Sequence, residues 1–214
     1  MTAATRRDRD FAARLSELPT PGEWNELFAY GFSPDSPTQV RDRALFLLML
    51  RSGLRVGEAA ALETSGLDMS AGRVDVPDVP GLTKRGARTT YFDKRDLGLS
   101  EAINAWLAMR GRLNPRTSRL FTTAQGRAIE DTTLLRQGLR KAAERTWNSG
   151  SRTAAGHHVH THALRHSFAT ESINRGAPLN VVQAALGHEK PDMTLRYIKA
   201  NPRQVSEWFD RNPW

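Results

Sequence analysis

A short stretch late in the chain gathers side chains that could do acid–base or nucleophilic chemistry. Between residues 160 and 201, four histidines and one tyrosine, Tyr197, are interleaved with apolar residues at helical spacing. His162 and Arg165 are three residues apart, so on a helix they share one face. Three kinds of site are compatible with this stretch: a metal centre, a DNA-binding helix-turn-helix and a phosphoryl-transfer centre.

The metal centre fits the sequence worst. His162 and His166 have the i, i+4 spacing of a zinc-binding helix, but Ala163 stands where the metallopeptidase motif places a glutamate base. Arg165, between the two histidines, would put a fixed cation beside the metal. The spacing therefore favours a metal centre least of the three.

A helix-turn-helix is compatible with two helices joined at "RGAPLN" in a basic chain. The chain has 31 Lys and Arg against 23 Asp and Glu, a formal net charge of +8, and a pI near 10.5. This balance favours polyanionic partners, because counterions are released when a phosphate backbone is neutralised. The helix-turn-helix does not explain the spacing of His162, Arg165, His188 and Tyr197.

Phosphoryl transfer through tyrosine gives those residues a chemical use. A phosphodiester under attack gathers negative charge on its non-bridging oxygens, and a forked donor such as Arg165 stabilises that charge. Histidine moves protons near neutral pH, and Tyr197 can act as nucleophile if neighbouring cations overcome its high pKa. A second arginine and a general acid must then come from elsewhere in the chain.

The rest of the sequence predicts a mainly α (α+β) fold with one small antiparallel sheet. Residues 1–17 form a charged amphipathic arm. The unbroken apolar run 44–50 predicts a helix that is buried on most sides and ends at Gly53. Helical spacing and turn residues predict further helices within 18–31, 54–66, 100–113, 130–147, 160–176, 178–187 and 190–200, and β-prone runs lie at 72–78 and 87–93.

Several single residues have structural readings. Trp24, Trp106 and Trp147 are expected to pack in the core. A polar loop carries His157, His158 and His160, which we expect to be solvated. The chain has no cysteine and no apolar run of about 18 residues, so we predict a cytoplasmic protein without disulfides or membrane contact.

Four landmarks in order carry a family resemblance: "SGLRVGEAAAL", "HALRHSFAT", "LGH", and Tyr197 nine residues after His188. Together they resemble the tyrosine recombinases, which include the phage integrases and the Xer-type chromosome-dimer resolvases. The resemblance covers roughly residues 18–200. It implies a catalytic domain there, between the arm and a tail, 201–214. The tail either docks on a neighbouring protomer, as is common in the family, or folds back onto its own core.

The resemblance implies site-specific DNA recombination by a transient 3′-phosphotyrosyl link and strand exchange, on double-stranded DNA and within a tetramer. Tyr197 would be the nucleophile, and Arg55 and Arg165 would clamp the phosphate. His162 would act in proton transfer, and His188 would hydrogen-bond a phosphate oxygen. No metal or other cofactor takes part in the family's chemistry.

Further residues have roles by the same resemblance. Lys84, in the turn between the two β-prone runs, would be the general acid to the leaving oxygen. Glu58, one turn after Arg55, would orient that guanidinium, and His166 would support the site. From their charge and position in the sequence, contacts to the DNA backbone are expected from basic residues of the hairpin and of the helix within 130–147, namely Arg85, Arg88, Arg136, Arg140 and Lys141. For the residues of that helix, an ordinary solvated face is the open alternative.

One departure from the family pattern affects these expectations. Only about 17 residues precede the catalytic pattern, too few for the helical domain with which most members clamp the other side of the DNA, so weaker and more salt-sensitive binding is expected. Two other functions stay open: a type IB topoisomerase-like activity that nicks and recloses one strand, and a DNA-binding regulator with the fold but no catalysis.

Overall fold

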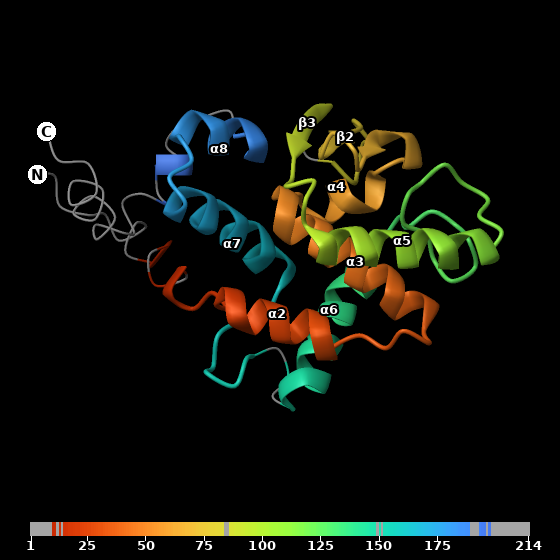
Figure 1. The fold of residues 1–214 in the computed structure, drawn as a ribbon, viewed down its shortest axis with the longest axis horizontal. Coiled ribbons are helices and arrows are strands. Elements are labelled where there is room, and N and C mark those ends of the chain that lie inside the picture. The colour runs from red at the N-terminus through yellow and green to blue at the C-terminus, as the bar shows by residue number, and fades with distance from the viewer. Residues whose placement is uncertain are drawn as a thin grey trace, which may run out of the picture.

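The computed structural model is a mainly helical fold with a small sheet at one side (Figure 1). It describes residues 10, 11, 13, 15–83, 86–148, 150, 152–188, 193–195 and 197. Within them the elements are α2 (Pro21–Tyr30), α3 (Pro37–Ser52), α4 (Val56–Ala61), η1 (Thr64–Gly66), β1 (Leu67–Asp68), β2 (Arg73–Val76), β3 (Arg88–Tyr91), α5 (Leu97–Arg112), α6 (Thr133–Trp147), α7 (Thr161–Asn174) and α8 (Leu179–Leu186). The predicted fold class is confirmed.

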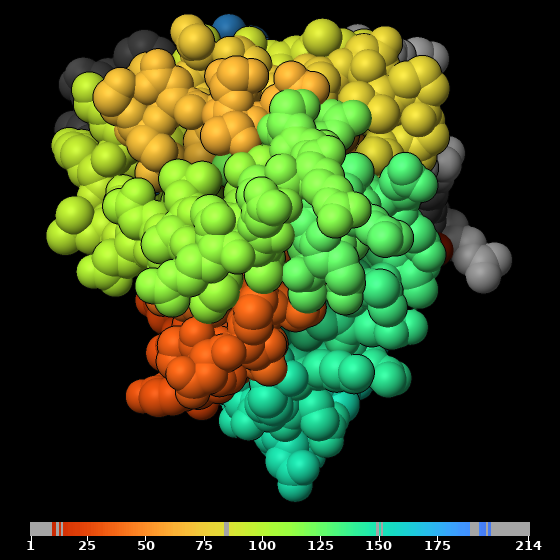
Figure 2. Space-filling model, turned by 90° about the vertical axis from the view of Figure 1, so that its right-hand side faces the viewer, coloured from red at the N-terminus to blue at the C-terminus, as the bar shows by residue number. Residues whose placement is uncertain are grey.

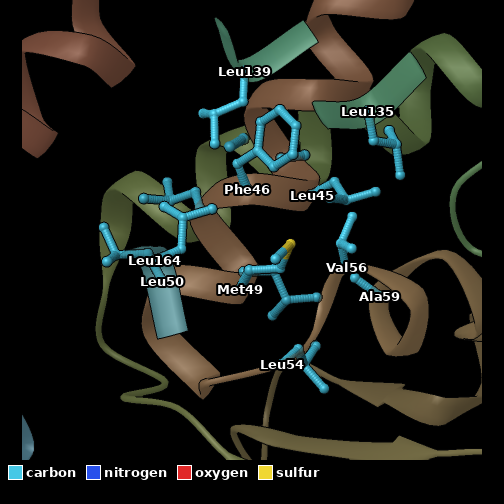
Figure 3. Packing of buried hydrophobic residues seen from close by; sticks show 14 of the residues in the cluster. Leu45, Phe46, Met49, Leu50, Leu54, Val56, Ala59, Leu135, Leu139 and Leu164 are labelled. Atoms are coloured by element: carbon cyan, nitrogen blue, oxygen red, sulfur yellow. The ribbon is translucent and has the colours of Figure 1, made fainter. Parts of the chain in front are cut away.

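Helix α3 lies at the centre of the core, in contact with α5, α6 and α7. Every residue of the apolar run from Ala44 to Leu50 is buried, as the sequence predicts. In Figure 3, Phe46 lies beside Leu139 of α6, and Leu50 lies beside Leu164 of α7. Because α3 packs on several helices at once, it fixes the position of α7 relative to the loop that follows α3.

Local capping decides where two of the helices begin. Helix α7 starts after His160, as predicted, and the His160 side chain accepts a hydrogen bond from the backbone N–H of Ala163 (3.2 Å). Helix α5 was expected from Ser100 but starts three residues earlier. Asp96 caps it by accepting a backbone hydrogen bond from its first turn (2.9 Å), a signal that the helical periodicity does not contain.

The sheet has the order β1-β2-β3 and is antiparallel throughout. Val74 on β2 pairs with Leu67 on one side and Thr90 on the other, and Val74 and Val76 both face the core. The two β-prone runs contain β2 and β3, so the predicted hairpin is confirmed. Strand β1 was missed, because two residues are too few for an alternating pattern.

Gly138 in the middle of α6 gives a stability prediction. Glycine normally weakens a helix by about 1 kcal/mol relative to alanine, so Gly138→Ala would usually stabilise. Here a Cβ atom would lie 2.4 Å from Oδ2 of Asp42, which is buried and ion-paired with Arg41 (2.6 Å). We therefore expect Gly138→Ala to lower the free energy of unfolding by about 1–3 kcal/mol.

Urea denaturation measures this change, and Gly111→Ala on α5 is the matched control because nothing lies within 4 Å of a Cβ built there. The control should hold or raise the stability of the chain. A stabilising effect of Gly138→Ala would contradict the packing of α6 against α3.

The end of the molecule away from α7 and α8 is closed by α5 and the segment that follows it, in green in Figure 2. The Trp106 ring is fully buried beneath them, and its Nε1 donates to the Leu120 carbonyl (2.8 Å). Trp24 is also buried and Trp147 partly so, as predicted. Among the described residues, no helix combines the length and the apolar character needed to cross a membrane.

Candidate active site

The candidate site forms where the C-terminal end of α3, the start of α4 and the C-terminal end of α8 meet the side of α7. Gly53 makes this meeting possible. It has a left-handed backbone (φ 69°), and a Cβ atom there would lie 2.5 Å from the Phe168 ring of α7. The chain turns at this glycine and places Arg55 at the N-cap of α4.

Arg165 comes from the middle of α7 and points into the protein, with 5% of its surface exposed. Its Nη1 donates to the Gly53 carbonyl (2.5 Å) and its Nη2 to the Leu186 carbonyl. These carbonyls end α3 and α8, and the C-terminal end of a helix attracts a cation. Two helix ends therefore fix the Arg165 guanidinium before any ligand arrives.

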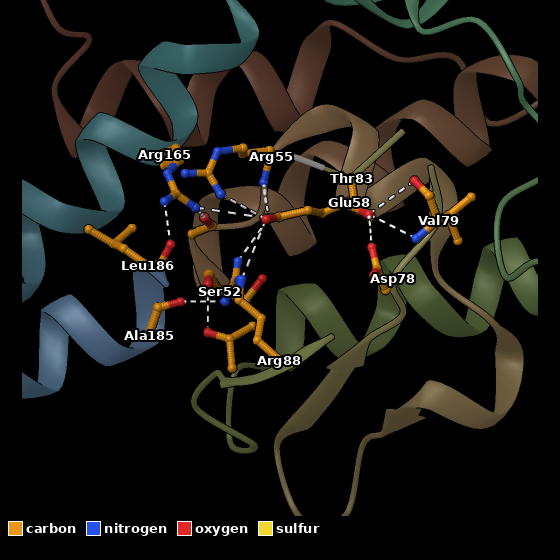
Figure 4. A network of polar contacts seen from close by, with 12 residues as sticks. Ser52, Arg55, Glu58, Asp78, Val79, Thr83, Arg88, Arg165, Ala185 and Leu186 are labelled. Carbon is orange, nitrogen blue, oxygen red and sulfur yellow. Dashed lines mark hydrogen bonds and ion pairs between the residues drawn. The ribbon is translucent and has the colours of Figure 1, made fainter. Parts of the chain in front are cut away.

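Glu58 of α4 joins the arginines into one network (Figure 4). Its buried carboxylate accepts hydrogen bonds from Arg55 Nη1 (2.8 Å) and Arg88 Nη2 (2.8 Å), and lies 3.9 Å from Arg165 Nη1. It also accepts from the Arg55 backbone N–H (2.8 Å). Glu58 thus contacts Arg55 as expected, and its role in orienting that guanidinium for a phosphate stays a prediction.

The charges in this network shift the pKa values of its members. Burial alone would raise the pKa of Glu58, but the hydrogen bonds and charges of Arg88 and Arg55 outweigh it, so that pKa lies below its ordinary value. Burial, and then the charge of Arg55, lower the pKa of Arg165 to about 9. At neutral pH the Glu58 carboxylate is therefore ionised and the Arg165 guanidinium is charged.

Arg88 lies inside the protein, contrary to expectation. It was expected to contact DNA, but its side chain is only 11% exposed, and its guanidinium is bound within the protein. Nη2 donates to Glu58 (2.8 Å) and Nη1 donates to the Ala185 carbonyl of α8 (2.6 Å). The Arg88 side chain also packs against Gly187, where a Cβ atom would lie 2.7 Å from Cδ of Arg88. Arg88 therefore ties β3 to α4 and α8.

Tyr197 is 5% exposed and lies in a short helical segment after α8. Its hydroxyl is 2.6 Å from Nδ1 of His166 on α7. Phe11 of the arm packs edge-on against the Tyr197 ring (centroids 5.2 Å apart) and against the His166 ring (5.7 Å). Burial raises the pKa of Tyr197 to about 12, although the charges of Arg165 and Arg55 act in the opposite direction.

A cavity of about 710 Å³ brings the predicted residues together. Its lining includes six of them: Arg55, His162, Arg165, His166, His188 and Tyr197. His162 is exposed, whereas His188 is buried, and its Nδ1 is 2.8 Å from the Thr194 hydroxyl. Guanidinium groups, imidazoles and a phenol facing one space can bind a phosphate, move a proton and supply a nucleophile.

Sequence reasoning missed the other six residues that line the cavity: Phe11, Glu17, Leu18, His158, His160 and Met193. The expectation that the loop histidines are solvated is also wrong for His157, which is half-buried with its Nδ1 2.8 Å from a Glu23 carboxylate oxygen. The cause is tertiary contact across more than 130 residues of chain, for which a single sequence gives no local signal.

The remaining predicted residues lie outside this cavity or outside the described structure. Lys84 and Arg85, which lie between β2 and β3 in the sequence, are outside the described residues. Arg136, Arg140 and Lys141 are exposed on α6. Nowhere in the described part of the chain do three or more His, Asp or Glu side chains form a group that could hold a metal ion.

The model of the phage integrase family matches residues 20–204, a range that includes every predicted site residue from Arg55 to Tyr197. The chain belongs to the phage integrase family. A curated relative, the tyrosine recombinase XerC of Haemophilus influenzae, is 33% identical over 176 residues, which are 82% of this chain and 54% of XerC. The chain therefore spans about half the length of this phage integrase relative.

Solved structures show the same fold for this family member. The XerA recombinase matches with a TM-score of 0.70 and 21% identity, over 92% of this chain and 65% of XerA. The XerH site-specific recombinase, in a post-cleavage complex with palindromic difH substrate, matches with a TM-score of 0.61 and 20% identity, over 96% of this chain and 52% of XerH. The helical catalytic fold with a small antiparallel sheet is thus common to these proteins.

Proposed function

We propose that this chain is the catalytic part of a site-specific DNA recombinase that cleaves and rejoins DNA through a 3′-phosphotyrosyl link at Tyr197. The observation that carries the proposal is the cavity in which the Tyr197 hydroxyl lies within reach of the charges of Arg55 and Arg165. Membership of the phage integrase family gives independent support. Guanidinium groups that are already in place stabilise the negative charge that develops on the phosphate during attack.

Under this proposal, the Tyr197 oxygen attacks a backbone phosphorus while Arg55 and Arg165 bind the non-bridging oxygens. The bond from phosphorus to the 5′-oxygen breaks, and Lys84 donates a proton to that oxygen. His162 and His188 bind or relay protons at the phosphate. A 5′-hydroxyl of the partner strand then attacks the link, reforms the phosphodiester and releases Tyr197.

The wider assembly belongs to the same proposal. The partner is double-stranded DNA, contacted by Arg85 and by the exposed basic residues of α6. The catalytic unit is 18–200, preceded by the arm 1–17, and strand exchange takes place within a tetramer. The tail 201–214 lies outside the described residues, and its docking on a neighbouring protomer stays a prediction, as does a cytoplasmic location.

A covalent protein–DNA adduct tests the proposal directly. The protein is incubated with nicked suicide duplexes from its own genomic neighbourhood, from which the short 5′-hydroxyl strand diffuses away after cleavage. After a detergent quench we expect an adduct on a denaturing gel. Peptide mass spectrometry should find the nucleotide on Tyr197, attached through a 3′-phosphate.

Other outcomes favour the alternatives. A retarded duplex in a native gel without any adduct would favour a DNA-binding regulator. Adduct formation together with relaxation of supercoiled DNA, but without any joining of strands from two duplexes, would favour a topoisomerase-like enzyme. An adduct at a residue other than Tyr197 would overturn the assigned chemistry.

A further inference from the structure

The Tyr197 hydroxyl needs a group to take its proton, because a neutral phenol is a poor nucleophile. The family resemblance implies proton transfer by His162. In this structure the imidazole on the hydroxyl is a different one, since Nδ1 of His166 lies 2.6 Å from the Tyr197 oxygen. That is the distance of a short, direct hydrogen bond.

We propose that His166 is the general base of the reaction and that it accepts the Tyr197 proton at Nδ1. The inference rests on the proposed recombinase function and adds a catalytic role for a residue otherwise expected only to support the site. In a neutral His166 ring with its hydrogen on Nε2, Nδ1 has a lone pair that accepts the hydrogen of the phenol.

The position of His166 suits a base better than that of its neighbour on α7. His166 is half-buried, whereas His162, one turn earlier on the same helix, is exposed at the cavity, with its ring centroid 6.4 Å from that of His166. Phe11 packs edge-on against both reacting rings, so the pair is held together away from bulk water. His162 is then available to the phosphate.

Under this proposal each proton that leaves one group in the cleavage step is returned in the rejoining step. The hydrogen of the Tyr197 hydroxyl moves to Nδ1 of His166 as the new bond from oxygen to phosphorus forms. His166 becomes an imidazolium, and the leaving 5′-oxygen takes its proton from the general acid. In the return step, a 5′-hydroxyl gives its proton to the same group, which is now deprotonated, and its oxygen attacks the phosphorus to reform the phosphodiester. His166 returns its proton to the phenolic oxygen as the link to Tyr197 breaks.

Several charged or titratable groups surround this pair and enter its pH dependence. Arg165 and His162 face the cavity from α7, and Arg55 faces it from the N-cap of α4. The arm, the loop before α7 and the segment after α8 add Glu17, His158, His160 and His188. The arginines hold positive charge on this side of the cavity, so an imidazolium at His166 forms only as negative charge develops on the phosphate.

The test compares single-turnover cleavage by the wild-type chain and by His166→Asn. The Asn amide can occupy the place of Nδ1 and hydrogen-bond the hydroxyl, but it cannot take a proton, so it separates catalysis from positioning. We expect adduct formation to slow by about 100-fold or more. The wild-type rate should fall as the pH drops through the titration of the imidazole, and this acidic limb should vanish in His166→Asn.

A second DNA substrate distinguishes the loss of a general base from the loss of a general acid. A duplex with sulfur in place of the bridging 5′-oxygen releases a thiolate, which needs no proton, so it rescues the loss of a general acid but not that of a general base. We expect the His166→Asn defect to persist on this duplex. The matched control is His157→Asn, which removes another half-buried imidazole bonded through Nδ1 (2.8 Å, to Glu23) and should cleave at the wild-type rate.

The outcomes are distinguishable. Wild-type rates and an unchanged pH profile in a folded His166→Asn would overturn the inference and leave the proposed function intact. Rescue by the sulfur duplex would place His166 at the leaving group and would also overturn it. Failure of the wild-type chain itself to form an adduct would mean that the proposed function has failed.

Discussion

Tyr197→Phe should abolish the covalent protein–DNA adduct while leaving DNA binding within about twofold of the wild-type affinity. The substitution removes one oxygen atom from a ring that is almost fully buried between His166 and Phe11. Phenylalanine keeps the packing, so the fold and the arginines around the phosphate stay in place. Only the nucleophile is lost, and no neighbouring group can form the same link.

The chain offers complete controls for this variant, because it contains three tyrosines in all. Tyr30 is 74% exposed and Tyr91 is 60% exposed, and neither lines the cavity. Tyr30→Phe and Tyr91→Phe should both form the adduct at the wild-type rate. Fluorescence anisotropy of a labelled duplex measures binding, and a denaturing gel measures the adduct. An undiminished adduct in Tyr197→Phe would refute Tyr197 as the nucleophile.

Glu58→Gln should weaken both the fold and the chemistry. The carboxylate is 2% exposed and is shared by Arg55, Arg88 and, at 3.9 Å, Arg165. An amide has the same shape but no charge, and its NH₂ group would face guanidinium donors. Removing one partner from a buried ion pair costs about 3–5 kcal/mol, so we expect a loss of this order in the free energy of unfolding. Cleavage should fall about 100-fold or more, because both clamping arginines lose their support.

The pKa shift of Glu58 predicts how the stability difference between wild type and Glu58→Gln changes with pH. The pKa of Glu58 is lower in the folded chain than its ordinary value of 4.5, so the carboxylate stabilises the fold above that pH. This contribution disappears as the pH falls through the folded pKa. The stability gap between wild type and Glu58→Gln should therefore be widest near neutral pH and should narrow below 4.5.

Urea titrations at a series of pH values measure the gap, with Glu171→Gln as the control. Glu171 pairs with Arg175 on the surface of α7 (2.7 Å), and such exposed pairs contribute less than about 1 kcal/mol. If Glu58→Gln does not fold, Glu58→Asp takes its place in the experiment. Aspartate keeps the negative charge, but its shorter side chain no longer reaches the arginines. A gap no larger than that of Glu171→Gln would show that the network does not hold the site together.

Most of the fold was predictable because its signals are local. The apolar run of α3 and the glycine stops after α3 and α8 are all written in short stretches of sequence. Where α5 begins and where β1 lies were not predictable in the same way. A single capping side chain decides the first, and the second has only two residues.

The site was predictable in its members but not in all their partners. Motif spacing led to six of the residues that line the cavity, yet Arg88 was assigned to DNA. Its inward direction depends on the Ala185 carbonyl, 97 residues away in the chain. The contact of Phe11 with Tyr197 depends likewise on packing between distant segments. Such contacts follow from tertiary structure, and no periodicity in the sequence encodes them.

The sharing of Glu58 has an electrostatic consequence for the reaction. Three guanidinium groups and one carboxylate leave the cluster with a formal charge of +2. A resting phosphodiester carries one negative charge, so the two together stand at +1. Attack by the Tyr197 oxygen brings the phosphorane to about −2, so the cluster and the phosphorane together sum to zero, while the proton taken from the phenol resides on His166 under the proposed transfer. The cluster thus matches the charge of the phosphorane better than that of the resting phosphodiester, which favours binding of the transition state over the substrate.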